Sequence, residues 1–327
     1  MTKSGAVQLQ SELICGRTLE KIKLYYCDTF ELPLPENHRF PMAKYTLLRQ
    51  RIAAAPLSSD CQLIVPPAAT DSEILLAHES QYLDRIKSGQ LSPVEIRRIG
   101  FPWSQGMVER SRRSTGATIS AARSAVNDGL SANLAGGTHH AFADSGQGYC
   151  VFNDVCVAAK VIQQQHKSIE RVMVVDCDVH QGNGTSGIVA NDASVFAFSV
   201  HCEENYPFKK TDGDLDIALP IGAQDDEYLS NLRTGIDTAM SLFNPDFVFY
   251  IAGADPFHGD RLGKLGLTKS GLRLRDELVI NYFRNLEIPV AIAMAGGYAP
   301  NIEDIVDIHF STIEVACQRF LKDKVGI

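Results

Sequence analysis

Short apolar runs that alternate with helix-length segments constrain the fold of this 327-residue chain more than any other feature of its sequence. The runs VMVVD, VFAFSV, FVFYIAG and VAIAMAGG are apolar on both faces of an extended chain, as strands covered on both sides are. Strands of this kind belong to parallel sheets between helices. The pattern therefore predicts an α/β fold of three layers around a mostly parallel sheet. We expect seven strands, at residues 22–26, 62–65, 132–135, 171–175, 195–200, 247–252 and 290–295.

The remaining sequence favours one domain over residues 21–327, preceded by a polar segment at 1–20, because no repeat or Pro/Gly/Ser-rich linker divides it. The net charge of −8 argues against a nucleic-acid partner, which requires a basic surface. No apolar run is long enough to span a membrane. The eight cysteines are scattered without a C-x-x-C pair, which favours a reducing, cytoplasmic location. The oligomeric state is left open.

A polar motif, DCDVHQGNGT, directly follows the predicted strand that ends at residue 175. Side chains at positions i, i+2 and i+4 of an extended chain share one face, so Asp176, Asp178 and His180 are expected to point together. Two carboxylates and an imidazole at a strand end are costly unless a cation compensates their charge. Capping and turn formation are the ordinary alternative for these residue types.

Asp255 follows the strand predicted at 247–252 and can supply a third ligand from a neighbouring strand end. One histidine and two aspartates with an open position are typical of a catalytic zinc site, and the oxygen-rich set also suits Fe²⁺, Mn²⁺ or Co²⁺.

Two further strand ends carry residues suited to proton transfer and to oxyanion stabilisation. His139 and His140 follow the strand at 132–135, and neutral imidazoles beside a metal can act as general base and acid near pH 7. Tyr298 follows the strand at 290–295, and its hydroxyl can donate to a developing oxyanion. Together these residue types predict metal-assisted hydrolysis of an acyl bond.

The strings GGTHHAF, GYCVFND, DCDVHQGNGT, GADPFHGDRLGKLGLT and AGGYAP resemble the histone deacetylase superfamily, in this order, between about residues 25 and 321. The loop PENHRFPMAKY, the run DDEYL and Gln181, where classes I and II have histidine, resemble the class IV branch and its bacterial relatives. The resemblance implies an arginase/deacetylase-like fold and removal of acetyl or longer acyl groups from lysine side chains. An acylated polyamine or small metabolite is the alternative substrate.

The resemblance also implies roles for individual residues. Zinc would be held by Asp178, His180 and Asp255, and Tyr298 would polarise the acyl carbonyl. His140, near Asn183, would be the general base for the attacking water. His139, near Asp176, would stabilise charge and help to protonate the leaving amine. The carboxylate beside one ring and the amide beside the other explain this asymmetry, because only the carboxylate stabilises imidazolium.

Two further sets of residues follow from the same resemblance. The substrate tunnel would be lined by Gly148, Phe152, Gly296 and Gly297. A structural potassium ion would lie near Asp176, Asp178, His180, Ser199 and Val200. The rim aspartate with which class I and II enzymes hold the substrate backbone has no recognisable counterpart.

The sequence also fits several rival interpretations. The run Gly182–Gly187 matches the G-x-G-x-x-G pattern of an NAD-binding oxidoreductase, although six residues separate it from the apolar strand. A two-metal, arginase-like hydrolase would share the fold class, and a metal-stabilised binding module would share the ligand residues. One set of arginines either attracts anions or, as is more usual, forms a solvated helix face: Arg97, Arg98, Arg110, Arg112, Arg113 and Arg123. The aspartates from Asp212 to Asp226 form either an acidic rim or ordinary turns.

Overall fold

A computed structural model describes residues 20–30 and 32–325. Its centre is one sheet of eight strands in the order β2-β1-β3-β8-β7-β4-β5-β6, and every pairing between neighbouring strands is parallel. The strands are β1 (Ile22–Tyr25), β2 (Cys61–Ile64), β3 (Leu130–Asn133), β4 (Val172–Asp176), β5 (Val195–Cys202), β6 (Leu215–Leu219), β7 (Phe247–Ile251) and β8 (Val290–Ala293).

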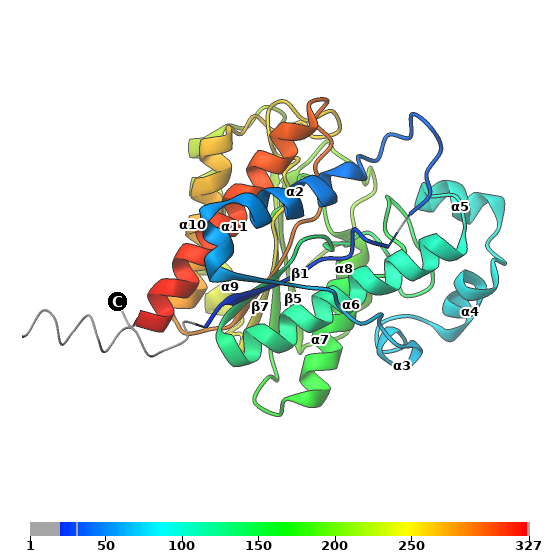
Figure 1. Ribbon diagram of the computed structural model, residues 1–327, viewed down its shortest axis with the longest axis horizontal. Coiled ribbons are helices and arrows are strands. Elements are labelled where there is room, and N and C mark those ends of the chain that lie inside the picture. The colour runs from blue at the N-terminus through cyan, green and yellow to red at the C-terminus, as the bar shows by residue number, and fades with distance from the viewer. Residues whose placement is uncertain (1–19, 31, 326–327) are drawn as a thin grey trace, which may run out of the picture.

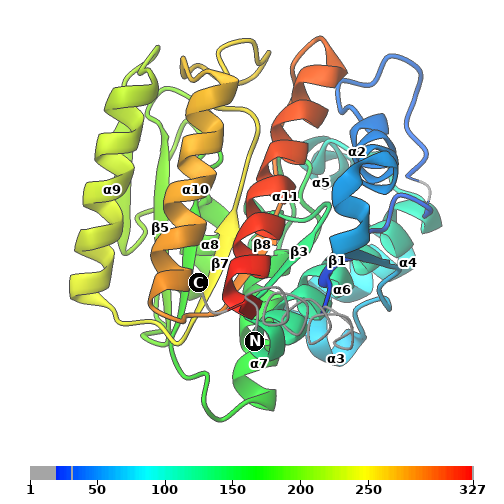
Figure 2. The ribbon, with the colours of Figure 1, turned by 60° about the vertical axis from the view of Figure 1, so that its left-hand side comes forward.

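Helices cover both faces of this sheet, so the predicted α/β fold with a parallel central sheet is confirmed (Figure 1). One face carries α2, α11, α10 and α9 side by side, and α6 and α7 pack on the other (Figure 2). The helices are α2 (Ala43–Ala54), α3 (Asp71–Ile74), α4 (Ser80–Ser88), α5 (Pro93–Ile99), α6 (Gln105–Asp128), α7 (Asp154–Gln165), α8 (Asn183–Val189), α9 (Asp225–Leu242), α10 (Lys269–Asn285) and α11 (Ile302–Val325).

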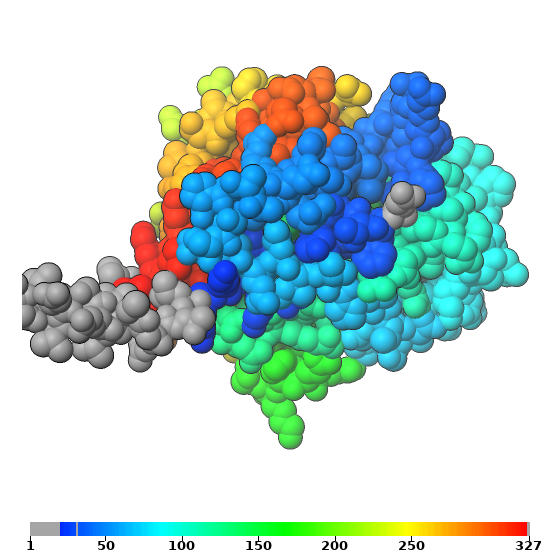
Figure 3. Space-filling model, in the orientation of Figure 1, coloured from blue at the N-terminus to red at the C-terminus, as the bar shows by residue number. Residues whose placement is uncertain are grey.

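The central strands are buried along their whole length, which explains why their sequences are apolar on both faces. Met173 and Val175 of β4 pack into the core under α9, α10 and α11, while Val172 and Val174 pack into the core under α6 and α7. The two cores lie on opposite faces of the sheet. In Figure 3, the blue segment that includes α2 forms the part of this face that lies between the red C-terminal helix and the cyan α5 region.

All seven predicted strands are present, with ends shifted by one or two residues. The largest shift is in β3, which ends at Asn133 because the Asn133 side chain accepts a hydrogen bond from the Ala135 amide (2.9 Å) and turns the chain away. The sequence analysis missed β6, an edge strand beside β5. Its residues are mostly half-buried, one of them is exposed and Asp216 interrupts the apolar sequence, so it lacks the continuous apolar run of a central strand.

No helix in the described residues is long and apolar enough to cross a membrane. The predicted polar segment at 1–20 lies almost entirely outside the described residues, and the domain boundary at residue 21 stays a prediction.

Candidate metal centre and active site

The sheet order places the four predicted strand ends next to one another. Strands β3, β8, β7 and β4 are consecutive neighbours, and because they are parallel their carboxyl ends meet at one edge. This edge is where ligands bind in open α/β sheets. The two histidines follow β3, Tyr298 follows β8, Asp255 follows β7, and the aspartate–histidine motif begins at the last residue of β4. Topology therefore brings together residues that lie far apart in the chain.

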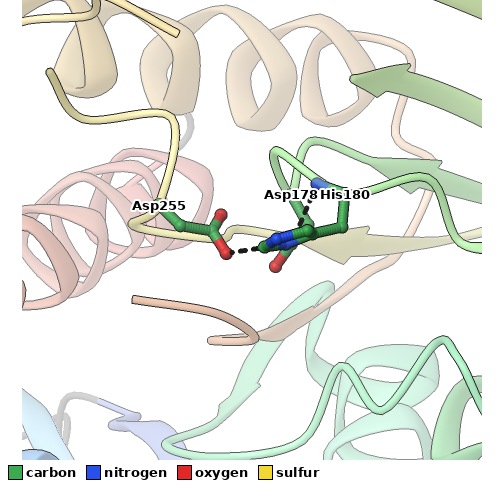
Figure 4. A group of neighbouring side chains, drawn as sticks. All are labelled: Asp178, His180 and Asp255. Atoms are coloured by element: carbon green, nitrogen blue, oxygen red, sulfur yellow. Dashed lines mark hydrogen bonds and ion pairs between the residues drawn. The ribbon is translucent and has the colours of Figure 1, made fainter. Parts of the chain in front are cut away.

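Asp178, His180 and Asp255 form a buried group whose potential ligand atoms all lie within 4.8 Å of one another (Figure 4). The Nδ1 atom of His180 is 2.9 Å from Oδ1 of Asp178 and 3.3 Å from Oδ2 of Asp255. The two carboxylates approach the imidazole from different strand ends, and the three side chains point toward one another. The structure thus brings together all three residues that the sequence suggested as metal ligands.

The two buried carboxylates of this group would be stabilised by a divalent cation. Burial and the neighbouring Asp178 carboxylate raise the pKa of Asp255 to about 7. Burial lowers the pKa of His180, but hydrogen bonds and the charges of Asp178 and Asp255 outweigh it and raise the value to about 10. Oδ2 of Asp255 is buried and, apart from the ion-pair distance of 3.3 Å to Nδ1 of His180, forms no hydrogen bond with the described residues. Two buried carboxylates, one of them with an unused oxygen, are what a cation would satisfy.

The histidine pair lies beside this group, with ring centroids 4.1 Å apart. Nδ1 of His139 is 2.6 Å from Oδ2 of Asp176, and Nδ1 of His140 is 2.7 Å from Oδ1 of Asn183. Burial lowers the pKa of His139, but the charges of Asp176 and Asp178 outweigh it and raise the pKa to about 9. Burial and the charge of His139 hold the pKa of His140 well below its usual value. At neutral pH one ring is therefore charged and the other is neutral.

Tyr298 stands on a turn after β8 that several buried groups hold in place. The Gly296 amide donates to Oδ2 of Asp178 (2.9 Å), and the Tyr298 amide donates to Oδ2 of Asp260 (2.6 Å). A side chain at Gly296 would collide with the carboxylates of Asp178 and Asp255, so only glycine fits there. Burial, followed by the charges of Asp255 and Asp178, raises the pKa of Tyr298 well above 10, which keeps its hydroxyl protonated as a donor.

A cavity of about 490 Å³ connects these residues to the surface. Its lining includes both histidines of the pair, Asp178, His180 and Tyr298, together with the predicted tunnel residues Gly148, Phe152 and Gly296. The fourth predicted tunnel residue, Gly297, is not part of the lining, because it packs against Ile305 and Ala254 instead. A tunnel role for Gly297 stays a prediction.

The residues predicted to surround a potassium ion include positions on two paired strands. Asp176 of β4 is in register with Ser199 of β5, and Val200 is the next residue of β5. The Asp178 amide donates to Oδ1 of Asp176 (3.1 Å), and the Ser199 hydroxyl is 2.9 Å from Nδ1 of His201. These residues are neighbours, and an ion at this place stays a prediction.

Sequence reasoning missed two buried cations near the site. The Nζ of Lys44 donates to the carbonyl of Ala295 (3.1 Å), in the turn that carries Tyr298, and burial lowers the pKa of this lysine to about 8. Arg110 lines the cavity, contacts the Tyr45 ring and has a buried Nε without a partner among the described residues. The family-like loop that contains Lys44 was the sequence signal for the lysine, whereas Arg110 had been placed among the arginines of an expected solvated helix face.

The expected solvated arginine face is correct only in part. Arg112, Arg113 and Arg123 form surface ion pairs with Asp71, Glu109 and Glu73. Arg110 is buried instead, because the side of α6 on which it lies faces the cavity and the core. Helical periodicity shows that two arginines lie on different sides of a helix, but it does not show which side is covered.

The acidic segment does not form a rim of the cavity. Asp214 accepts the Ala197 amide (2.8 Å), Asp216 accepts the Gly213 amide (2.7 Å), and Asp225 accepts the Thr268 amide (2.9 Å). Turn formation, the second of the two interpretations, accounts for these residues.

The glycine run at 182–187 packs under the histidine pair rather than forming an open phosphate loop. A side chain at Gly182 would contact Asp176, and one at Gly184 would meet the backbone of His140. The space that a pyrophosphate would need is filled by protein. The dinucleotide-binding alternative is therefore not supported.

Arg275 of α10 joins the two loops that carry the ligand group. It is fully buried and donates to the carbonyl of Gly253 (2.6 Å) and to that of Cys177 (3.3 Å). Its charge is balanced by Asp276, 2.8 Å away. We expect Arg275→Met to lower the free energy of unfolding by about 3–5 kcal/mol, because it leaves Asp276 charged and unpaired in the interior. Urea denaturation of purified protein measures this loss.

A surface arginine on the same helix provides the matched control. Arg273 pairs with Glu277 and Glu314 at distances of 3.1 and 3.4 Å, where both partners are in contact with solvent. We expect Arg273→Met to cost about 0–1 kcal/mol. Equal losses for the two variants would show that Arg275 does not support the site through its buried contacts.

The fold and the cavity place this chain in the class of metal-dependent hydrolases. The cavity combines a buried Asp-His-Asp group with a charged histidine, a neutral histidine and a tyrosine, at the end of an open parallel sheet. Comparison with known families places the chain more narrowly. The histone deacetylase domain matches residues 38–313, and the chain belongs to the histone deacetylase family.

Individual relatives agree with this assignment. An uncharacterised protein of Picosynechococcus sp. is 43% identical over 284 residues, covering 87% of this chain and 94% of its own. Histone deacetylase 2 of Arabidopsis thaliana is 29% identical over 308 residues, covering 89% of this chain and 78% of its own. The acetoin utilization protein AcuC of Bacillus subtilis is 28% identical over 255 residues, covering 71% of this chain and 65% of its own.

Solved structures share the fold. The crystal structure of a histone deacetylase homologue complexed with SAHA superposes with a TM-score of 0.78 at 24% identity, covering 93% of this chain and 89% of that one. The HD domain of HDA15 superposes with a TM-score of 0.76 at 22% identity, covering 93% of this chain and 95% of that one.

Proposed function

We propose that this chain is a zinc-dependent amidohydrolase that removes acetyl or longer acyl groups from lysine side chains. The observation that carries the proposal is the histidine pair beside the Asp-His-Asp group, with the carboxylate of Asp176 on one ring, the amide of Asn183 on the other and both rings facing the cavity. This arrangement provides a proton acceptor and a positive charge at the same reaction centre. Membership of the histone deacetylase family supports the same reaction.

Asp178, His180 and Asp255 would hold the metal. When bound, a divalent metal polarises the acyl carbonyl and lowers the pKa of water. We propose zinc because one nitrogen and two carboxylate ligands with an open position suit it, and Fe²⁺, Mn²⁺ or Co²⁺ are possible substitutes.

The side chains of the protein then have separate tasks. His140 is neutral, is oriented by Asn183, and takes the proton of the attacking water. His139 is charged and held by Asp176, so that it stabilises negative charge and delivers a proton toward the leaving amine. Tyr298 donates its hydroxyl hydrogen to the acyl oxygen as charge develops there. The narrow wall at Gly148 and Phe152 limits the space for water around the acyl-lysine chain.

We further propose a class IV assignment and a structural potassium ion. Gln181 is buried and donates to Oδ1 of Asp216 (3.0 Å) and to the carbonyl of Thr211 (3.0 Å), so it anchors the motif where other classes have histidine. Asp176, Asp178, His180, Ser199 and Val200 would surround the potassium ion. The cytoplasmic location inferred from the cysteines also remains a prediction.

A panel of fluorogenic lysines with acyl groups from acetyl to myristoyl, together with acetylated polyamines, tests the proposed reaction. We expect metal-loaded protein to hydrolyse at least one acyl-lysine about 10⁶-fold or more above the uncatalysed rate. Chelation should abolish turnover, and added zinc should restore it. The absence of turnover on every acyl-lysine by protein with bound metal would contradict the proposed function.

A further inference from the structure

The outer part of the cavity is lined mainly by positive charge. Arg97 and Arg98, in the last turn of α5, and Lys264, in the loop after β7, all line the cavity and are all exposed. We call these three residues the cationic rim. The exposed Glu204 is the one carboxylate beside them among the described lining residues. A substrate that enters the cavity must pass these side chains.

The cations of the rim are available to a ligand. Within the described part of the chain, the side chains of Arg97 and Arg98 form no hydrogen bond and no ion pair. Lys264 donates through Nζ to the backbone carbonyl of Glu204 (3.0 Å), so it meets a neutral group rather than a carboxylate. Their charges are therefore not cancelled by acidic partners inside the protein.

The rim lies close to the reacting groups. The Gly148 amide donates to the backbone carbonyl of Arg98 (3.0 Å), and a side chain at Gly148 would touch the rings of both His140 and Tyr206, so the backbone of Arg98 lies next to the residue that separates it from these rings. The Tyr206 ring in turn lies edge-on to the ring of His140, with centroids 4.9 Å apart. A charged group on the substrate a few residues from the acyl-lysine would therefore be within electrostatic range of the rim.

The sign of the rim is opposite to that of the whole chain, which carries a net charge of −8. The candidate acidic residues Asp214, Asp216 and Asp225 are used in turns and do not line the cavity. A cleft lined by one sign of charge raises the local concentration of ligands of the other sign. The local charge thus favours anionic substrates despite the acidic composition.

We propose that the substrate of this chain carries carboxylates next to the acylated amine, as an acyl-lysine within an acidic peptide segment does. This inference rests on the proposed deacylase function and names the substrate class for the same site. It disfavours polybasic tails and acetylated polyamines, because bringing a cationic substrate past three cations costs free energy.

Three peptides that share one central acyl-lysine test the proposal, with flanks of Asp and Glu, of Gly and Ser, or of Lys and Arg. We expect kcat/KM to be at least about tenfold higher for the acidic than for the basic peptide at low ionic strength. The ratio should fall toward one at about 1 M salt, where charges are screened beyond about 3 Å. A second pair, Nα-blocked acetyl-lysine as its carboxylate and as its amide, shows whether a small carboxylate suffices or a peptide is required.

Charge reversal locates the effect. Arg97→Glu combined with Arg98→Glu should bring the ratio of acidic to basic kcat/KM down at least about tenfold. Lys167→Glu combined with Lys322→Glu makes the same change in net charge at exposed positions near the amino ends of the strands, away from the cavity. This double variant should leave the ratio of acidic to basic kcat/KM close to that of the original protein. Equal shifts in the two double variants would overturn a local role of the rim.

The neutral peptide separates this inference from the function on which it rests. Turnover of the neutral peptide with an equal or reversed preference between the charged peptides would overturn the inference and leave the deacylase function intact. No turnover of any of the three peptides by metal-loaded protein would overturn both.

Discussion

We expect Asp178→Ala to lose bound metal and hydrolytic activity together. Its carboxylate contributes one of three potential ligands, and the group of described residues has no fourth member that could replace it. Changes to residues that only support a ligand cost about 10–100-fold in metal affinity, so removal of a ligand should cost more than about 100-fold. Metal content after dialysis, measured alongside kcat/KM, should drop from about one equivalent to near zero.

Asp178 also accepts hydrogen bonds from the His180 amide (2.9 Å) and the Gly296 amide (2.9 Å), so alanine at this position could disturb the fold. Asp178→Asn retains an acceptor of the same shape without the charge, and it should fold but bind metal weakly. Asp226→Ala, an exposed position in the first turn of α9, is the matched control. An Asp178 variant that remains active without metal would refute the ligand assignment.

Tyr298→Phe should lower kcat by about 10²–10³ and leave metal content and thermal stability unchanged. The loss is that expected for removal of one oxyanion donor. The Tyr298 hydroxyl forms no hydrogen bond with any described residue, whereas the backbone amide of Tyr298 is held by Asp260. Phenylalanine therefore removes the donor without removing a contact that supports the turn. Steady-state kcat, metal content and thermal unfolding, all measured on the same preparation, check these three quantities.

Tyr149→Phe provides a control in the same cavity, since the Tyr149 ring lies 5.9 Å from that of Tyr298. We expect a much smaller change in kcat, because no role in the reaction follows from its position. If Tyr298→Phe and Tyr149→Phe lose activity equally, the loss of kcat comes from a change in the polarity of the cavity and not from the loss of a specific donor. A rate for Tyr298→Phe close to that of the original protein would remove this hydroxyl from the mechanism.

The sequence predicted the central strands well because their burial on both faces leaves an unmistakable pattern. The runs at 172–175 and 247–251 are apolar at every position, and each is followed at once by polar or small residues. The pattern failed for β6, which has a neighbouring strand on one side only and whose short apolar sequence is interrupted by Asp216. Edge strands are partly covered, and their sequences resemble those of loops.

The buried cations show a second limit of sequence reasoning. Lys44, Arg110 and Arg275 are almost completely buried, although their residue types are normally exposed. Each is covered by segments distant in sequence. Lys44 meets the turn at Ala295, and Arg275 meets the carbonyls at Cys177 and Gly253. No local pattern specifies these contacts, which exist only after the sheet has assembled.

The sequence by itself determined the parallel α/β architecture and the residue types of the ligand group and of the histidine pair, while the two different partners of that pair came only from the resemblance to a family. The architecture and these residue types depend on local periodicity and on the position of polar residues after strands. Only the tertiary structure decided which strand ends are neighbours, which arginine is buried and which sign of charge surrounds the cavity. The reason is physical: burial and electrostatic environment are set by distances between segments, and those distances follow from the order of the strands rather than from any single stretch of sequence.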